Sequence, residues 1–321
     1  AFNFVAGTEG LELNVDSAVR TISDYLENSW TSDNTAVLNL ETQVTEPEGS
    51  AEELANIKDL LGSFTTSFST SGSNRCKNVS SGASHINGTV LYPGEEFSAY
   101  ETVSPFTEAN GYAMAGSYLN GEVVDSMGGG ICQVSTTLYN AVLRAELNVT
   151  ERSPHSMTVH YVDLSEDAAI AGTYKDFKFV NSTEYPIYIE GYTTSDKKIT
   201  FNIYGKETRD KNRTISFESQ MVSETPATTI LQEDAGQGIG YKAVSSKGSS
   251  GYVAELYKIV KVNGVETDRI KVNKSTYKGT NRVVTYGTAG DPTLSENLRA
   301  AIAAQDEALA DANIAAAVPA Q

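Results

Sequence analysis

The chain is poor in cysteine, histidine and positive charge. Its 321 residues include two cysteines, three histidines, and 24 basic against 41 acidic residues, which gives a net charge of −17. Two cysteines cannot make a disulfide framework, and neither the Cys-x-x-Cys nor the His-x-x-x-His spacing of zinc sites occurs in the sequence. An acidic chain also lacks the basic footprint of nucleic-acid-binding proteins. We therefore expect no metal, no cofactor and no nucleic-acid partner.

Long apolar runs are also missing. No segment has the roughly 20 consecutive apolar residues that a membrane-spanning helix needs. A signal peptide is not recognisable either, and the chain opens abruptly at Ala1-Phe2-Asn3-Phe4. We expect a mature fragment from which any N-terminal anchor has been removed, and hence no membrane contact in this chain.

One cysteine stands in a chemically pointed context. Cys132 follows the glycines at 128–130, and the apolar residues after it recur with the spacing of one buried helix face: Ile131, Val134, Leu138, Ala141, Val142 and Ala145. This pattern places Cys132 in the first turn of a helix, where the dipole and free N–H groups can lower a thiol pKa to roughly 3.5–7.5. A thiol so placed is a candidate nucleophile. The loop residues Gly129, Gly130 and Ile131 would let backbone N–H groups form an oxyanion hole.

Two alternative roles for this cysteine stay open. Free cysteine is often simply a small buried residue on a packed helix. A bridge to Cys76 would stabilise the fold but block the nucleophile. Because Cys76 lies in a polar, turn-like stretch, Ser73 to Asn78, we expect a half-exposed free thiol there.

A base for the thiol is sought among the three histidines. The segment after Pro154 has the composition of a strand, in which His155 and His160 would face opposite sides. Only one of the two can then point towards the helix.

The stretch from about Phe64 to Lys206 resembles the VanW family. The motifs that carry the resemblance are Thr66-Ser67-Phe68-Ser69, Asn74-Arg75 with Asn78, Asn87 to Leu91, Pro93 to Ser98, Gly111-Tyr112, Gly128 to Tyr139, Glu151-Arg152 to His155-Ser156, and Asp167-Ala168. The family pattern Arg-x-x-His-Ser falls on Arg152, His155 and Ser156, so the resemblance selects His155 over His160.

The resemblance implies cell-wall chemistry, namely L,D-transpeptidation of peptidoglycan. Cys132 would form a thioester with a stem peptide, His155 would carry the proton, and N–H groups near Gly130 and Cys132 would hold the oxyanion. Asp167 could orient the imidazole, but an aspartate before two alanines could equally cap or turn the chain. Candidate substrate-binding residues in the motifs are Arg152, Gln133, Ser135, Arg75 and Tyr112. Arg152 could equally form a structural ion pair.

The same resemblance sets the partners, the location and the alternatives. The partners would be stem peptides and glycan, and the protein would lie outside the cell, in the wall or anchored at the outer face of the membrane. A thiol hydrolase that passes the acyl group to water is the first alternative. A non-catalytic wall-binding or adhesion protein with a structural cysteine is the second.

We expect an α+β fold in four parts, divided at residues 1–62, 63–206, 207–288 and 289–321. The first part carries a net charge of −10 and resembles part of a peptidoglycan-binding module, with a helix over 15–30, a strand over 36–44 and a helix over 52–61. The second is the catalytic domain. The third is an all-β extended module with strands over 214–222, 252–262 and 265–272, and Asn263-Gly264 indicates a type I′ hairpin.

The third part resembles a G5 domain, a small β-module linked to binding of wall sugars. On that resemblance Tyr241, Tyr252 and Tyr257 could stack on sugar rings. The fourth part is an alanine-rich tail with helical propensity over 298–317, which we expect either to fray or to dock on a neighbour.

Overall fold

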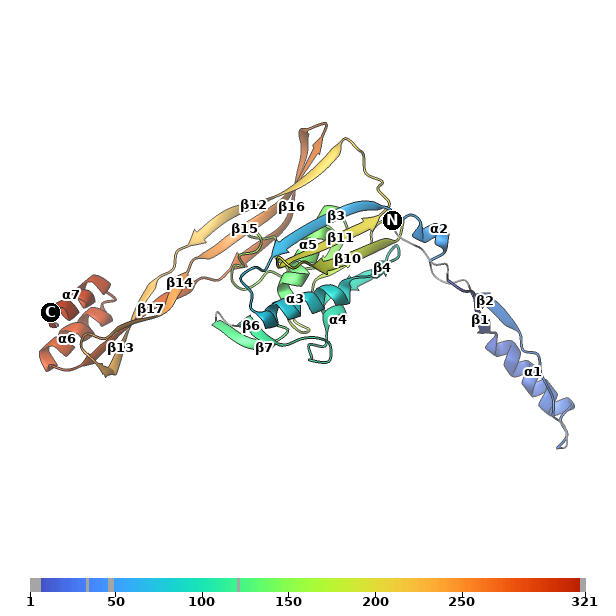
Figure 1. Cartoon of the computed structure of the whole chain (residues 1–321), viewed down its shortest axis with the longest axis horizontal. Helices are drawn as coiled ribbons and strands as arrows, with labels where there is room; N and C mark the ends of the chain where they lie inside the picture. The colour runs from blue at the N-terminus through green and yellow to red at the C-terminus, as the bar shows by residue number, and fades with distance from the viewer. Residues whose placement is uncertain (1–6, 33–34, 46–48, 120–121, 318–321) are drawn as a thin grey trace.

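The computed structural model describes residues 7–32, 35–45, 49–119 and 122–317. Figure 1 shows an elongated molecule, with an N-terminal helix at one end, a central α+β domain, a long strand module, and two helices at the other end. Helices account for 25% and strands for 40% of the structure. The expected mixed α+β class, with a largely β C-terminal region, is confirmed.

A four-stranded antiparallel sheet forms the frame of the central domain. Its strand order is β3 (Asp59–Ser67), β11 (Lys198–Gly205), β10 (Ile187–Thr193) and β4 (Thr89–Leu91). Helix α5 (Ile131–Ala145) packs on β3 and β11, and α3 (Ser73–Ile86) packs on β10. Gly62 allows α5 to approach the sheet closely, because a Cβ there would lie 2.4 Å from the carbonyl oxygen of Ala141.

Smaller elements complete this domain. A three-stranded sheet has the order β5 (Glu96–Ser98), β9 (Lys178–Val180), β8 (Asn148–Glu151), and β6 (Met114–Leu119) pairs with β7 (Glu122–Met127) in a hairpin just ahead of α5. The short helix α4 (Ala99–Val103) follows β5. One core cluster joins the helices to the sheet, and its fully buried members include Val79, Ile86, Val134, Leu138, Ile189 and Phe201.

Helix α5 confirms the periodicity of the sequence, whereas the strand expected after Pro154 is wrong. Between β8 and residue 162 the chain runs through bends and irregular backbone. The backbone N–H of His155 donates to the Asp167 carboxylate at 2.7 Å. At His155 the backbone therefore bonds to a side chain and not to a neighbouring strand. The alternation of residue types alone could not predict this.

The N-terminal part has β1 (Gly10–Leu13), α1 (Val15–Asn28), β2 (Thr42–Thr45) and α2 (Ala51–Leu54). The first helix is confirmed, and Asn14 caps it. The strand expected over 36–44 is limited to β2. The helix expected over 52–61 stops after one turn, because β3 begins at Asp59 and pairs with β11. The expected boundary at residue 62 therefore falls inside a strand of the central domain.

This N-terminal part has little core of its own. The apolar face of α1 is exposed, from 40% at Ile22 to 63% at Val15, and Ala18 is the buried residue of the helix.

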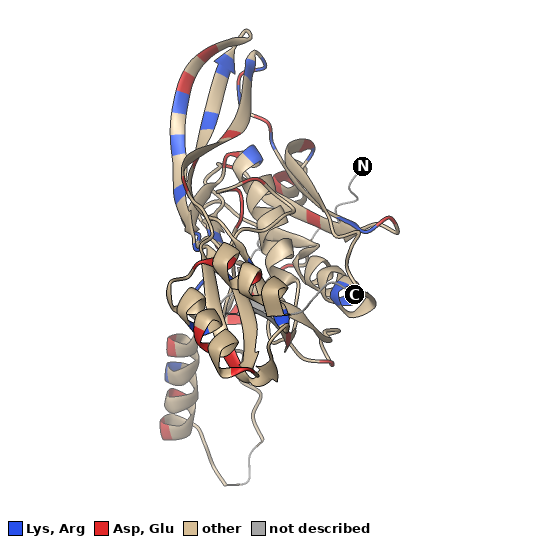
Figure 2. Cartoon of the chain, turned by 90° about the vertical axis from the view of Figure 1, so that its left-hand side faces the viewer, with Lys and Arg blue, Asp and Glu red and all other residues tan. Residues whose placement is uncertain are grey.

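The strand module contains two three-stranded sheets. One has the order β12 (Arg213–Thr225), β15 (Gly251–Val262), β16 (Val265–Tyr277), and the other has β13 (Thr229–Gly238), β17 (Thr280–Ala289), β14 (Lys242–Ser249). The three strands predicted here are confirmed, as is the tight turn at Asn263 and Gly264, both with positive φ. Strand β16 runs five residues further than predicted, to Tyr277. Figure 2 shows basic and acidic residues interspersed along the long strands.

The alanine-rich tail docks instead of fraying. It forms α6 (Pro292–Ala303) and α7 (Glu307–Ala317), which pack with Leu231, Val284 and Tyr286 in a second core cluster. The single helix expected over 298–317 is interrupted, because Gln305 adopts a positive φ and its side chain bonds the backbone of Leu231. Within the described part of the chain, no helix is both long and apolar enough to cross a membrane.

Candidate active site

Cys132 is the second residue of α5. Gly130 caps the helix in the left-handed region at φ 103°, which glycine adopts without strain. The thiol is half-buried and donates to the carbonyl of Ile170 at 3.3 Å. Both cysteines are free, so the bridge to Cys76 is absent. Cys76 is half-buried as expected, but it lies in the first turn of α3 instead of in a turn.

The glycine loop offers fewer free N–H groups than the sequence suggested. Gly129 donates to the carbonyl of Ser126 at 3.2 Å, and Ile131 donates to that of Gly128 at 3.0 Å. These two members of the predicted oxyanion loop are therefore already engaged. The N–H groups of Gly130 and Cys132 have no backbone acceptor among the described residues, so they are the candidate oxyanion donors of this loop.

His155 and Asp167 meet at the helix terminus. The ring Nδ1 of His155 lies 2.6 Å from Oδ2 of Asp167, which also accepts the His155 backbone N–H. The ring and the Cys132 thiol each shift the pKa of the other, so the two groups lie near one another. The structure thus brings Cys132, His155 and Asp167 together, while His160 lies exposed on the wall of a neighbouring cleft.

The protonation of this group follows from its contacts. Burial acts to raise the pKa of the Cys132 thiol, but the hydrogen bond and positive charge of His155 hold it below the usual value. Burial acts to lower the pKa of His155, but Asp167 and Cys132 together raise it to about 9. Burial likewise opposes ionisation of Asp167, yet His155 and Arg152 keep its pKa below the usual range. Both shifts act in the direction of a thiolate–imidazolium pair.

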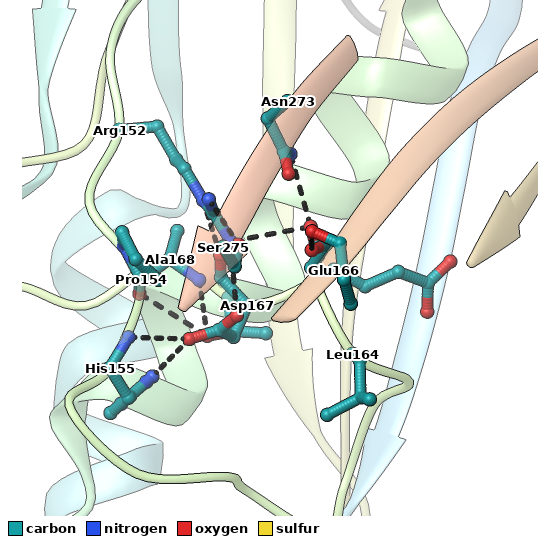
Figure 3. A network of polar contacts seen from close by, with 12 residues as sticks. Arg152, Pro154, His155, Leu164, Glu166, Asp167, Ala168, Asn273 and Ser275 are labelled. Atoms are coloured by element: carbon teal, nitrogen blue, oxygen red, sulfur yellow. Dashed lines mark hydrogen bonds and ion pairs between the residues drawn. The ribbon is translucent and has the colours of Figure 1, made fainter. Parts of the chain in front are cut away.

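Arg152 is structural. Its Nη2 lies 3.0 Å from Oδ1 of Asp167, its Nε donates to the Asp167 carbonyl at 2.7 Å, and its side chain is only 7% exposed (Figure 3). Of the two roles left open for it, the ion pair is the one present, and a substrate carboxylate cannot reach it.

A cleft of about 940 Å³ lies beside the helix terminus. It is lined by residues 67–75, 115–117, Gln133 and 159–161. The Arg75 side chain lies against Gly130, where a Cβ would stand 2.8 Å from its Cγ. Its guanidinium donates to the hydroxyl of Ser71 at 2.6 Å and to the amide oxygen of Gln133 at 2.8 Å. Within the described residues Arg75 has no carboxylate partner. Its positive charge therefore lies at the cleft with only the uncharged side chains of Ser71 and Gln133 as hydrogen-bond partners.

Three of the other predicted substrate-binding residues do not face the cleft freely. Gln133 is buried and anchors Arg75 while donating to Thr66 and Ser67. Ser135 is buried and donates to the carbonyl of Ala168 at 2.7 Å. Tyr112 is fully buried, and its hydroxyl donates to the carbonyl of Val103. Ser135 and Tyr112 are therefore packing residues: they belong to the motifs of the resemblance, but their side chains lie in the core.

The structure does not gather the three tyrosines of the strand module. Tyr241 precedes β14 in one sheet, whereas Tyr252 and Tyr257 lie in β15 of the other sheet. Five residues along a strand separate the latter two by about 17 Å. Their hydroxyls donate to Glu224 and Glu255. The three tyrosines therefore do not form one stacking platform, and a role for each of them in sugar binding stays a prediction.

Sequence reasoning missed several polar residues around Asp167. The hydroxyl of Tyr277 in β16 donates to Oδ1 of Asp167, and Ser275 accepts from Nη1 of Arg152 at 2.9 Å. Tyr161 is a third residue that was missed: burial raises its pKa, and the charges of both Cys132 and Arg75 reach it. The first two lie more than 100 residues beyond Asp167, so no local motif could have indicated them. Among the described residues, no cluster of His, Cys, Asp and Glu could hold a metal ion.

Comparisons with known proteins fall on the same two regions. Residues 74–204 match the family model described as VanW like protein, and residues 218–289 match that of the G5 domain. The uncharacterized protein YoaR of Bacillus subtilis (strain 168) is 40% identical over 144 residues, which cover 44% of this chain and 48% of that protein. The vancomycin B-type resistance protein VanW of Enterococcus faecalis (strain ATCC 700802 / V583) is 29% identical over 138 residues, covering 41% and 49%.

The chain thus spans about half the length of the curated relatives it matches. Among solved structures, an IgA1 protease G5 domain is 24% identical and covers 26% of this chain and 100% of its own, with a TM-score of 0.20. The crystal structure of HP0197-G5 is 20% identical and covers 23% and 97%, with a TM-score of 0.17.

Proposed function

Because this chain carries a VanW-like domain followed by a G5 domain, we propose that it is a cysteine L,D-transpeptidase of the cell wall. The observation that carries the proposal is the Cys132–His155–Asp167 group at the start of α5, next to a cleft with a cation at its side. A nucleophile, a base and a third group that orients the base are the parts that acyl transfer requires.

The chemistry runs in two halves. The Cys132 thiolate attacks the carbonyl between the third and fourth residues of a stem tetrapeptide, and the N–H groups of Gly130 and Cys132 stabilise the oxyanion. The C–N bond then breaks, His155 gives its proton to the departing amine of D-alanine, and a thioester remains. The side-chain amine of a second stem attacks this thioester and loses a proton to His155. A 3→3 crosslink forms, and the thiolate is regenerated.

Arg75 has a place in this scheme. Its guanidinium lies beside the loop that precedes the nucleophile and has only neutral partners. A planar fork of N–H donors suits a carboxylate. We assign to it the terminal carboxylate of the donor peptide, which stands one residue beyond the attacked carbonyl.

The substrate places the protein outside the cell, with peptidoglycan as its partner. The curated relative from Enterococcus faecalis is named for vancomycin B-type resistance, and a wall-directed activity is in keeping with that name. The G5 domain would hold the chain on wall glycan, although the dispersed positions of Tyr241, Tyr252 and Tyr257 argue against one aromatic platform.

The test is mass spectrometry of the protein incubated with purified disaccharide-tetrapeptide. Wild type should gain the mass of the donor minus D-alanine and release 3→3 dimers, whereas Cys132→Ser should do neither at an unchanged melting temperature. A serine hydroxyl has nearly the same shape, but its far higher pKa prevents ionisation at this site. Dimers formed by the serine variant at the wild-type rate would refute the nucleophile. Tripeptide without dimer from wild type would identify a thiol hydrolase.

A further inference from the structure

Strand β16 of the G5 domain contacts the segment that contains Asp167. Three residues at the end of β16 contact the segment around this carboxylate: Asn273 donates to the Ser165 carbonyl, Ser275 accepts from Arg152, and Tyr277 donates to Asp167 (Figure 3, in which Asn273 and Ser275 are labelled). Both Ser275 and Tyr277 are buried. Strand β16 is therefore a wall of the catalytic centre and not only part of a distant module.

The Asp167 carboxylate is fully engaged. Oδ2 accepts from the backbone N–H and the ring of His155, and Oδ1 accepts from Arg152 at 3.0 Å and from Tyr277 at 2.5 Å. Each oxygen thus receives two donors. The contacts on Oδ2 orient the imidazole of His155. Those on Oδ1 fix the plane of the carboxylate.

The Tyr277 hydroxyl also fixes the backbone ahead of Asp167. It accepts the N–H of Ser165 at 2.7 Å while donating to Asp167, so one oxygen joins both residues. Ser165 has a φ of 68°, a left-handed conformation that a residue with a side chain adopts only at a cost. Its hydroxyl donates to Ala254 of β15 at 2.9 Å. The strained residue is therefore held by β15 and β16 of the G5 domain.

We propose that Tyr277 is a positioning residue of the active site, through which the G5 domain sets the orientation of Asp167 and hence of His155. The inference rests on the proposed role of Cys132 and His155 in acyl transfer. It adds that the VanW-like domain alone does not contain the complete active site. Tyr277 touches neither substrate nor sulfur and acts only through the carboxylate.

Loss of the hydroxyl has a defined consequence. In Tyr277→Phe the buried N–H of Ser165 loses its acceptor and Oδ1 of Asp167 keeps only Arg152, so the 165–167 segment must move to find new partners. The charged and titratable groups around Asp167 are His155, Arg152, Tyr277, Tyr139, Tyr161, Cys132 and Glu166. All except Tyr277 remain in the variant, so no formal charge is lost, and a change in the thiol reports on the carboxylate that the hydroxyl held.

The experiment measures the rate of Cys132 alkylation by iodoacetamide from pH 5 to 10, in the full chain with Cys76→Ser as background. In Tyr277→Phe the midpoint of the thiolate limb should move up by about one pH unit, which is about tenfold in thiolate below the midpoint. The rate of thioester formation should fall about tenfold as well. A residue that merely stabilised the fold would lower the melting temperature and leave the midpoint in place.

Tyr252→Phe is the matched control. Tyr252 is paired with Tyr277 across the same sheet, but its hydroxyl donates to Glu224, so the midpoint should not change. An unshifted midpoint in Tyr277→Phe overturns the proposal. Should that variant fail to fold, Ser275→Ala makes the same test by removing the Ser275 partner of Arg152. Alkylation needs no wall substrate, so a shifted midpoint without transpeptidation would retain the positioning role and reject the proposed reaction.

Discussion

The side chain of Arg75 shows how a single residue can be prepared for a ligand. Buried Gln133 and the hydroxyl of Ser71 fix the guanidinium without neutralising it. An arginine kept free of carboxylates in a cleft retains its full charge for a ligand, and the planar fork adds directional specificity.

Arg75→Ala should raise KM for the donor peptide about 10- to 100-fold with a much smaller change in kcat. The lost interaction is a charge-assisted hydrogen bond made in both the ground state and the transition state. Arg75→Lys should recover only part of this, because an ammonium cannot bind in bidentate fashion. Lys77→Ala, an exposed change on the same helix, is the control. Steady-state kinetics with a donor peptide whose terminal carboxylate is amidated complete the test. Amidation should change KM for wild type more than for Arg75→Ala. An equal change of KM in both proteins would contradict the assignment.

At the same scale, the sequence indicated the proposed nucleophile and base and missed the residues that hold them. Cys132 and His155 stand in short motifs whose neighbours are adjacent in the chain. Tyr277 is separated from Asp167 by 110 residues, and a tyrosine near the end of a β-strand has no feature that distinguishes it from a packing residue. Tyr112 shows the opposite error: it lies in a motif and was predicted to bind substrate, but its side chain is buried in the core.

Among the elements, α5 connects the proposed active site at its N-terminus to the G5 sheet at its C-terminus. Glu146 caps the helix C-terminus at φ 59° and is 13% exposed. Its carboxylate pairs with Arg213 of β12 and Lys258 of β15, and Arg209 lies 3.5 Å away. Burial opposes ionisation of Glu146, but Arg213 and Lys258 lower its pKa to about 2.

Glu146→Gln should lower the free energy of unfolding by about 3 kcal/mol at pH 7, because the cations would be left without their partner. The pKa of Glu146 is depressed in the folded state. Its contribution is therefore complete above pH 4.5, the usual glutamate value, and is lost as the pH falls towards 2. Denaturant titrations at pH 7 and pH 3 should show the difference shrinking by more than half. Glu207→Gln removes a more exposed pair with Arg209 and should cost well under 1 kcal/mol. Equal losses in the two variants would contradict this interpretation.

Elements were predictable where local pattern and tertiary pairing agree. The 3.6-residue period indicated α5, and the Asn-Gly signal indicated the β15–β16 turn. The pattern failed at 52–61, where Ser50 and Glu53 form a capping box and start a helix, but residues from Asp59 pair with β11. Pairing between strands about 140 residues apart cannot be seen in a local window.

For the whole molecule, the two domains share one core. Leu256 of β15 is fully buried in the same cluster as the central sheet and α5, and Phe217 and Val272 pack against it. An interface built from core residues resists separation more than two domains on a linker would.

A chain ending at residue 212 should therefore lose activity and show a lower melting temperature, and its Cys132 should react as an ordinary thiol. Removal of residues 1–45 is the control, because the apolar face of α1 is already exposed, so the active site should be unaffected. Calorimetry and the alkylation rate measure both effects. A shortened chain ending at 212 with wild-type reactivity would show that the G5 strands are dispensable.

The hydrogen bond from Tyr277 to Asp167 has a consequence for inheritance. Recombination that exchanged the G5 domain for another wall-binding module would bring in a foreign strand and strip the carboxylate of one of its four donors. Such a chimera would keep every motif residue and would still lack one of the groups that orient Asp167. Positions 165, 167 and 277 are therefore expected to change in concert among descendants, and the two domains to travel together through evolution as one heritable unit.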